Sequence, residues 1–437
     1  MDDVGAASEA QMESSGSAMQ LSQSTTAAME IMQDEDFTNQ FQVSSGIDGT
    51  DLLEGLTNYF VQYEIPVGLI NKLMALQFYH LHFIVDDSGS MRANTDSMMS
   101  EATPYLLRGQ VVAPTQPMTR WQEAENRLHT MIDVLAYIPT KPITISFMNA
   151  PNVITLNRVG NTPEAFQRAA HDQISQAFSS IDVRYKTPTF RVLTQSFNEA
   201  ASRSDPTMHY LLTDGVPSDA SVDQVASLIS QRRAPEANPV TLISCTNEDA
   251  EAEWMKQVEE RAPFTSELDD FHDERNEVIS DQGSGFPYTK GYWIVCQLVS
   301  AINPDDLDAI DENLPFTKNT LDNLLGRVHT PQEYQYYFER NPHAPLYVDL
   351  YPRFLNEGTF SRAFVSREEQ LRREMSAGYR DGARPTTAPA RPEAIRHLLA
   401  PHTSASGSAT VFSFGSSPPA NTGAPPPYSD APPPYGS

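Results

Sequence analysis

Between residues 76 and 265, short apolar runs alternate with longer amphipathic segments. The apolar runs are rich in β-branched or aromatic side chains and span residues 79–85, 143–148, 208–212 and 239–244. Segments with helical periodicity follow them, at residues 121–138, 163–178, 190–202 and 222–232. Strands that are apolar throughout and joined by helices are typical of a parallel sheet covered on both faces. The pattern predicts a doubly wound α/β domain with a mostly parallel sheet.

The segments on either side of this sheet domain predict helices. Residues 51–75 carry apolar side chains at helical spacing and are interrupted by Pro66, which predicts a lead-in of short helices. Residues 266–360 show helix-like patterns at 291–302 and 304–314 and few strand signals. We therefore expect a helical annex that packs on the sheet domain.

The two ends of the chain have compositions typical of disorder. Residues 1–50 contain nine acidic residues and no Lys or Arg, so little apolar area offsets the chain entropy. Residues 361–400 hold eight Arg and five acidic residues, which predicts an Arg-rich helix and linker. Residues 401–437 hold nine prolines among small polar residues, which predicts a disordered, polyproline-like tail.

The charge and cysteine content exclude several classes of protein. The chain has 30 Lys and Arg against 57 Asp and Glu, a formal net charge of -27, which argues against nucleic-acid binding and against docking on anionic lipid. Its two cysteines, Cys245 and Cys296, lie in apolar stretches and are expected to be reduced core thiols. The first 30 residues lack the pattern of a secretory signal, and no apolar run is long enough to span a membrane. We expect a cytoplasmic protein with no transmembrane segment.

The strongest local signal is the loop that follows the first apolar strand, with the sequence DDSGSM. In an open parallel sheet, ligands bind where strands end at the carboxyl edge. Asp86, Ser88 and Ser90 stand there at alternate positions and offer one carboxylate and two hydroxyls. Hard divalent cations prefer such oxygen ligands, and Mg²⁺ takes few carboxylates. Thr187 opens a later helix and Asp214 ends a later strand, so three separate elements are expected to converge on one ion.

The order DDSGSM, then TPT before a helix, then an apolar strand followed by TDGVP resembles the von Willebrand factor A domain with the metal-ion-dependent adhesion site of integrin-type members. The resemblance covers the sheet domain and implies a von Willebrand factor A or Rossmann-like fold. It implies that the serines and the threonine contact the metal directly, and that the carboxylates act directly or through water. The implied metal ligands are Asp86, Ser88, Ser90, Thr187 and Asp214.

The resemblance also implies what the site would bind. The metal would be Mg²⁺, with Mn²⁺ or Ca²⁺ as alternatives, and a partner protein would offer Asp or Glu to its free coordination position. The competing interpretation is a fold of this type whose site is empty or purely stabilising. No nucleophile elbow, phosphate loop or zinc-protease motif occurs, so we expect no enzyme, with a metal-assisted hydrolase as the alternative.

Three other features lead to further expectations. Asp87 should point away from the site as a surface residue. His80 and His82 share one strand face like a zinc pair, but without a third ligand they are expected to be packed or capped. The long segment 92–120 contains three prolines and is either a lid or specificity loop over the site or a mobile insertion.

The C-terminal tail carries two PPxY units. Proline presets the left-handed extended helix, so little entropy is lost when such a segment docks in an aromatic groove. PPxY resembles the ligand of WW domains, such as those of HECT-type ubiquitin ligases; a proline-rich linker is the alternative. The expected contact residues are Pro425, Pro426 and Tyr428 in one unit and Pro432, Pro433 and Tyr435 in the other.

Together these features predict a divalent-metal-dependent protein-binding adaptor. Its tail would recruit WW-domain proteins, either ubiquitin ligases or trafficking machinery. The alternative is a metal-dependent binding module whose tail is only a linker.

Overall fold

The computed structural model of this 437-residue chain describes residues 49–356, except 159, 247, 304–306, 309 and 312–314. The Arg-rich segment, the proline-rich tail with both PPxY units and residues 1–48 of the acidic tail lie outside the described residues.

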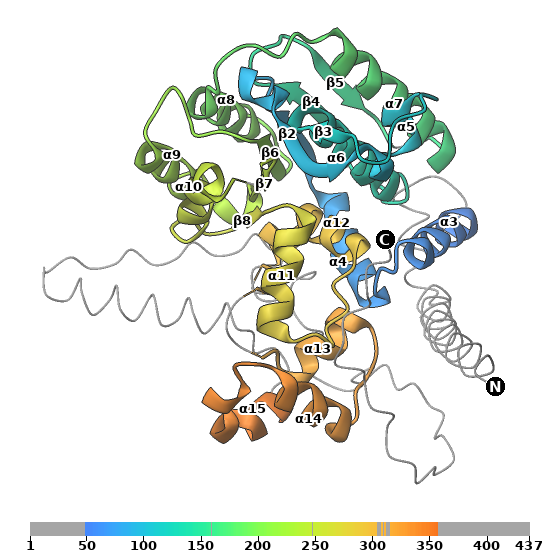
Figure 1. Cartoon of the computed structure of the whole chain (residues 1–437), viewed down its shortest axis with the longest axis vertical. Coiled ribbons are helices and arrows are strands. Elements are labelled where there is room, and N and C mark those ends of the chain that lie inside the picture. Colours follow the sequence, from blue (N-terminus) through green and yellow to red (C-terminus); the bar gives the residue numbers. More distant parts are fainter. Residues whose placement is uncertain are drawn as a thin grey trace, which may run out of the picture. The chain divides into compact units, whose positions relative to one another are not determined.

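A six-stranded sheet forms the core of residues 80–268, in the order β5-β4-β1-β6-β7-β8 (Figure 1). Five strands are parallel, and β5 pairs antiparallel to β4 at one edge. The α/β class and the mostly parallel sheet are therefore confirmed. The strands are β1 (His80–Val85), β4 (Ile143–Phe147), β5 (Val153–Leu156), β6 (Thr207–Thr213), β7 (Val240–Ser244) and β8 (Thr265–Leu268).

Helices cover both faces of the sheet. The core on one face joins Ile84 of β1, Leu211 of β6 and Leu242 of β7 to apolar side chains of α8, α9 and α10. On the other face, the Tyr210 hydroxyl donates to the Leu298 carbonyl of α12 at 2.9 Å, so this annex helix packs on the sheet. The helices of the sheet domain are α6 (Arg120–Leu135), α7 (Pro163–Ser180), α8 (Thr189–Ala201), α9 (Val222–Ser230) and α10 (Asp249–Glu259).

Local sequence signals explain where several of these helices begin. Thr119 and Gln122 form a capping box at the start of α6, in which each side chain bonds the backbone of the other. Thr162 caps α7, whose first residue is a proline, a favourable position because proline has no N–H to leave unpaired. The capping box thus fixes Arg120 as the first residue of α6.

The helical lead-in and annex are present. The lead-in comprises α3 (Gly49–Gln62), the 3₁₀ turn η1 (Val67–Leu69) and α4 (Ile70–Met74), with Pro66 at the predicted break. The described residues of 304–314 lie in turns, so the helix expected there is wrong for them; its repeated aspartates are poor interior helix formers. The annex helices are α11 (Phe271–Gln282), α12 (Lys290–Val299), α13 (Lys318–Leu325), α14 (Pro331–Arg340) and α15 (Tyr351–Asn356).

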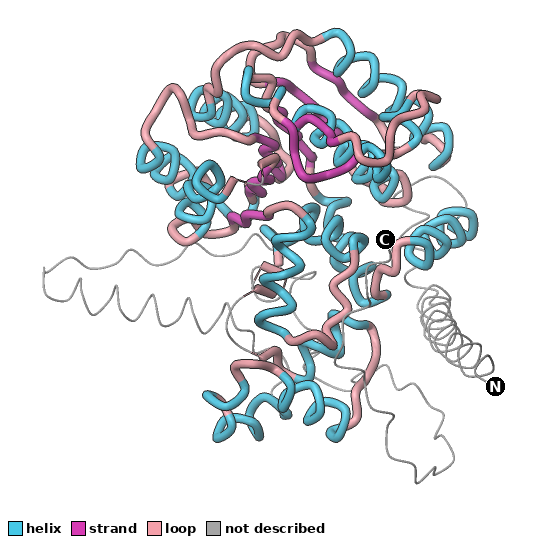
Figure 2. The backbone as a smooth tube through the Cα atoms, viewed as in Figure 1, coloured by secondary structure: helices cyan, strands magenta, loops and turns pink. Residues whose placement is uncertain are grey.

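The segment 92–120 has a defined structure of its own. Strands β2 (Asn94–Met98) and β3 (Pro117–Thr119) form an antiparallel pair separate from the main sheet (Figure 2). A short helix, α5 (Pro104–Leu107), lies between them, and a small core of Met99, Leu106 and Met118 holds the segment together. No helix in the described ranges is both long enough and apolar enough to cross a bilayer.

Candidate metal centre

Backbone hydrogen bonds hold the loop after β1 against two neighbouring loops. The Asp86 amide donates to the Leu212 carbonyl at 2.8 Å, which continues the pairing of β1 with β6. The Gly89 amide donates to the Tyr185 carbonyl at 2.9 Å, and Ser88 forms a parallel bridge with Tyr185. The loop is therefore fixed next to the segment that carries Thr187.

The structure brings the five predicted ligands together at the carboxyl edge of the sheet. Ser88 Oγ lies 3.0 Å from Ser90 Oγ, and Ser90 Oγ donates to Asp214 Oδ1 at 2.8 Å. Asp86 Oδ1 accepts a bond from the Ser88 amide at 2.8 Å, which orients this carboxylate within its own loop. A methyl group placed on Gly215 would lie 3.4 Å from Thr187 Oγ1 and 3.7 Å from Ser90 Oγ. These two hydroxyls therefore flank the same small volume, which the glycine leaves open.

Four of the five candidate ligands are buried. Asp86 and Asp214 are 0% exposed, and Ser88 and Thr187 are also buried. Ser90 is exposed. Solvent, an ion or a partner side chain can therefore reach the group past Ser90.

The two carboxylates differ in how their charge is balanced. Among the described residues no ion pair involves Asp86, and burial, with a smaller contribution from the nearby Asp214 charge, raises the pKa of Asp86 to about 6. Asp214 Oδ2 instead accepts a bond from Arg120 Nη1 at 2.9 Å, and Arg120 Nη2 lies 2.8 Å from Glu251 Oε2. Burial still raises the pKa of Asp214, although the Arg120 guanidinium acts in the opposite direction.

Arg120 contacts the candidate centre and was not predicted from the sequence. It is buried and belongs to the first turn of α6, where the helix macrodipole disfavours a positive charge. An arginine in the first turn is unfavourable unless a carboxylate balances its charge. This placement is the one signal in the sequence for such a carboxylate. The carboxylate lies 94 positions away in the chain, so the sequence alone did not identify it.

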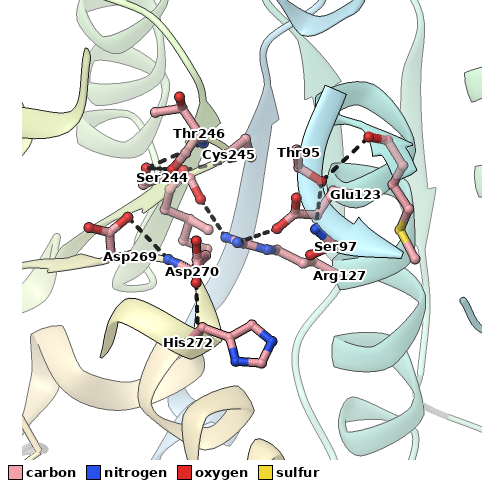
Figure 3. Close-up of polar contacts among 12 residues, drawn as sticks. Thr95, Ser97, Glu123, Arg127, Ser244, Cys245, Thr246, Asp269, Asp270 and His272 are labelled. Carbon is pink, nitrogen blue, oxygen red and sulfur yellow. Dashed lines mark hydrogen bonds and ion pairs between the residues drawn. The ribbon is translucent and has the colours of Figure 1, made fainter. Parts of the chain in front are cut away.

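A second buried arginine anchors α6 to the sheet. Arg127 lies between Glu123 of the same helix and the Ser244 carbonyl at the end of β7, with both contacts at 2.5 Å (Figure 3). Its guanidinium also lies 4.9 Å from the centre of the Trp293 ring. Arg120 and Arg127 are two helical turns apart and share a face of α6, so this anchor also fixes the position of Arg120.

Asp87 points away from the candidate ligands as expected, but the expectation that it lies on the surface is wrong. Asp87 is 0% exposed, and its carboxylate accepts bonds from the Asn149 amide at 2.9 Å, the Asn149 side chain at 2.8 Å and the Ala150 amide at 2.8 Å. The side chain therefore turns toward the loop after β4. Asn149 also donates to the Lys186 carbonyl at 2.9 Å, so Asp87 supports the loop that carries Thr187.

The expectation of packed histidines is confirmed. His82 contacts Ser196 Oγ at 2.8 Å and Ser146 Oγ at 2.9 Å, and His80 contacts Thr144 Oγ1 at 3.0 Å. Across the described residues no three His, Cys, Asp or Glu side chains are arranged to hold a metal ion. A cation at the candidate centre would therefore depend on hydroxyl ligands as well as carboxylates.

No protein-family model and no curated protein matches the sequence. Among solved structures, the manganese-loaded TRAP protein of Plasmodium vivax is similar, at 14% identity and a TM-score of 0.30, over 46% of this chain and 71% of that chain. The PilB minor pilin of Streptococcus sanguinis is similar at 12% identity and a TM-score of 0.31, over 44% and 57%. The ArnB paralog VWA2 of Sulfolobus acidocaldarius is similar at 18% identity and a TM-score of 0.28, over 48% and 46%. The chain spans about half of the last two proteins, and at these TM-scores the likeness lends no weight to a function.

Proposed function

We propose that the chain is a protein-binding module that depends on a divalent cation, with Mg²⁺ as the best-suited ion. The observation that carries the proposal is the meeting of three hydroxyls and two buried carboxylates from three separate loops. The donor set fits a hard cation, because every candidate ligand atom is an oxygen. The ligands would be Asp86, Ser88, Ser90, Thr187 and Asp214.

The Arg120–Asp214 ion pair favours an acidic partner. Asp86, Asp214, Arg120 and Glu251, which also pairs with Arg120, sum to a formal charge of -2, since three carboxylates and one guanidinium give -3 and +1. Asp214 Oδ2 is already engaged by Arg120, so a divalent cation would be only partly neutralised by the groups that face it, and when bound it would supply a Lewis-acidic position for an oxygen ligand. An Asp or Glu side chain from a partner protein, entering past the exposed Ser90, would complete the neutralisation.

The proposal describes binding, not catalysis. The Ser88 and Ser90 hydroxyls bond each other and Asp214, and neither bonds a histidine that could act as a base. Together with the two PPxY units, this supports an adaptor that recruits WW-domain proteins such as HECT-type ubiquitin ligases. We place this activity in the cytoplasm, where the buried thiols Cys245 and Cys296 would stay reduced.

Calorimetric titration of the full chain with MgCl₂ and MnCl₂ tests the metal centre directly. Wild-type protein should take up one equivalent of cation, and Thr187→Val should lose most of that binding because it removes a hydroxyl ligand while preserving the side-chain shape. Asp96→Asn removes an exposed carboxylate on β2 and should bind like the wild type. Equal cation uptake by the wild type and Thr187→Val would refute the centre.

The adaptor function needs a separate experiment. Partner capture from a cell extract should require Mg²⁺ and fail in EDTA for a chain that lacks residues 401–437. Capture by isolated WW domains should depend on the tail and not on the cation. Failure of the cation-dependent capture alone would show that the metal-centre half of the proposal is wrong. Failure of the WW-domain capture alone would show that the tail half is wrong.

A further inference from the structure

A polar pocket lies at the amino ends of the strands, the opposite edge of the sheet from the candidate metal centre. Its volume is about 610 Å³. His80 begins β1, Lys141 precedes β4, and Arg203 lies in the turn between α8 and β6, and all three line it. The pocket is thus formed where three connections enter the sheet, and none of its lining residues belongs to the candidate metal centre.

The pocket is positively charged in a strongly acidic protein. Lys141 pairs with Asp205, which also lines the pocket. Arg203 has no ion pair with any residue that the structure describes, and it is exposed. Two cations and one carboxylate leave a formal charge of +1, whereas the whole chain carries -27. An unpaired guanidinium in a pocket is available to an anion from outside.

Hydroxyl groups complete the lining. Thr144 and Thr155 are partners across β4 and β5. Thr144 Oγ1 contacts His80 Nε2 at 3.0 Å, and Ser204 adds a hydroxyl from the same turn as Arg203. Burial, and after it the Arg203 charge, lower the pKa of His80 to about 4, so the cation acts on the interior of the pocket.

We propose that this pocket binds a tetrahedral oxyanion of the phosphate class. Arg203 and Lys141 supply the charge, and the hydroxyls of Thr155 and Ser204 supply further donors from other directions. A tetrahedral anion has enough acceptor oxygens to use donors on several sides at once. The same chemistry serves a free phosphate ion and a phosphoryl group on a serine of a partner protein.

Calorimetric titration of the full chain with inorganic phosphate tests this site, with chloride as the control anion. Wild-type protein should bind phosphate saturably, and Arg203→Gln should weaken the affinity by about tenfold or more, the usual effect of losing a charge-assisted bond. Arg168→Gln removes the same charge from the exposed side of α7 and should leave the affinity unchanged. Thr155→Asp places a carboxylate in the pocket from the exposed face of an edge strand and should abolish binding.

A parallel titration with phosphoserine distinguishes the two sources of the anion. Tighter binding of phosphoserine than of phosphate would assign the pocket to a modified partner protein, and equal or weaker binding would assign it to the free ion; both outcomes support an oxyanion site. The absence of saturable phosphate binding by the wild type would overturn the proposal. Equal phosphate affinity of the wild type and Arg203→Gln would also overturn it, provided that thermal melts show both proteins to be folded.

Discussion

Replacing Arg120 by methionine tests whether the buried guanidinium occupies part of a cation site. The substitution keeps an unbranched apolar stem and removes the positive charge that lies 2.9 Å from Asp214 Oδ2. Both partners are buried, with the arginine side chain 6% and the aspartate side chain 0% exposed. Removing one partner of such a pair leaves an uncompensated charge and costs about 3 to 5 kcal/mol. The second contact, to the 41% exposed Glu251, adds less than about 1 kcal/mol.

We therefore expect Arg120→Met to lower the free energy of unfolding by about 3 kcal/mol in EDTA, near the lower end of that range. Magnesium should reverse most of this loss, because the freed Asp214 carboxylate can then face the ion. A ligand that binds only the folded state at 100 times its dissociation constant contributes about 2.7 kcal/mol, so the variant in Mg²⁺ should nearly regain the stability that the wild type has in EDTA. The variant should also bind Mg²⁺ more tightly than the wild type.

Thermal melts of both proteins in EDTA and over a series of Mg²⁺ concentrations provide the assay. Arg168→Met, on the exposed face of α7, controls for the loss of one positive charge. A variant as stable as the wild type in EDTA would show that the ion pair contributes nothing. A destabilised variant that magnesium fails to restore would show that Asp214 does not face a cation site, and the assignment of the centre would fall with it.

Three further predictions concern other parts of the molecule. Asp86→Asn should abolish Mg²⁺ uptake in calorimetry. Its melting temperature in EDTA should equal or exceed that of the wild type, because the substitution removes a buried charge without a cationic partner. A Mg²⁺ affinity equal to that of the wild type would contradict this prediction. Burial lowers the pKa of His82 to about 4 from 6.5, so the unfolded chain binds more protons than the folded chain between these two pH values. The free energy of unfolding should therefore fall by up to roughly 3 kcal/mol as the pH is lowered from 6.5 toward 4. Melts at pH 7 and pH 5 should show a smaller loss for His82→Gln than for the wild type, and an equal loss would refute that assignment. Alanine at both Tyr428 and Tyr435 should weaken WW-domain binding of a tail peptide by roughly tenfold or more, measured by calorimetry, whereas unchanged affinity would identify the tail as a linker.

The apolar runs were sufficient to predict the central strands, because β1, β6 and β7 are buried on both faces. The two edge strands escaped prediction for different physical reasons. Strand β5 is four residues long and alternates exposed with buried side chains. Strand β8 carries polar residues and begins at residue 265, the predicted end of the sheet domain. Short or polar edge strands depend on their neighbours more than on their own composition.

The candidate site shows a similar division. Asp86 and Asp214 could be placed from the sequence because parallel strands end at one edge of a sheet. The Arg120 contact and the burial of Asp87 could not, because each depends on partners that only the packing of α6 and the loop after β4 bring near. The sequence was enough to place the candidate oxygen ligands, whereas the residues that set their charge and orientation could be identified only from the structure.

The segment between Arg92 and Arg120 departs from the sheet domain and returns to almost the same place, since the Arg120 amide donates to the Ala93 carbonyl at 2.9 Å. Val111, between its two ends, is fully exposed. A fluorescent label or affinity tag inserted at Val111 would therefore lie on a segment whose two ends are hydrogen-bonded to each other. It could report on the candidate centre without interrupting the residues that form it.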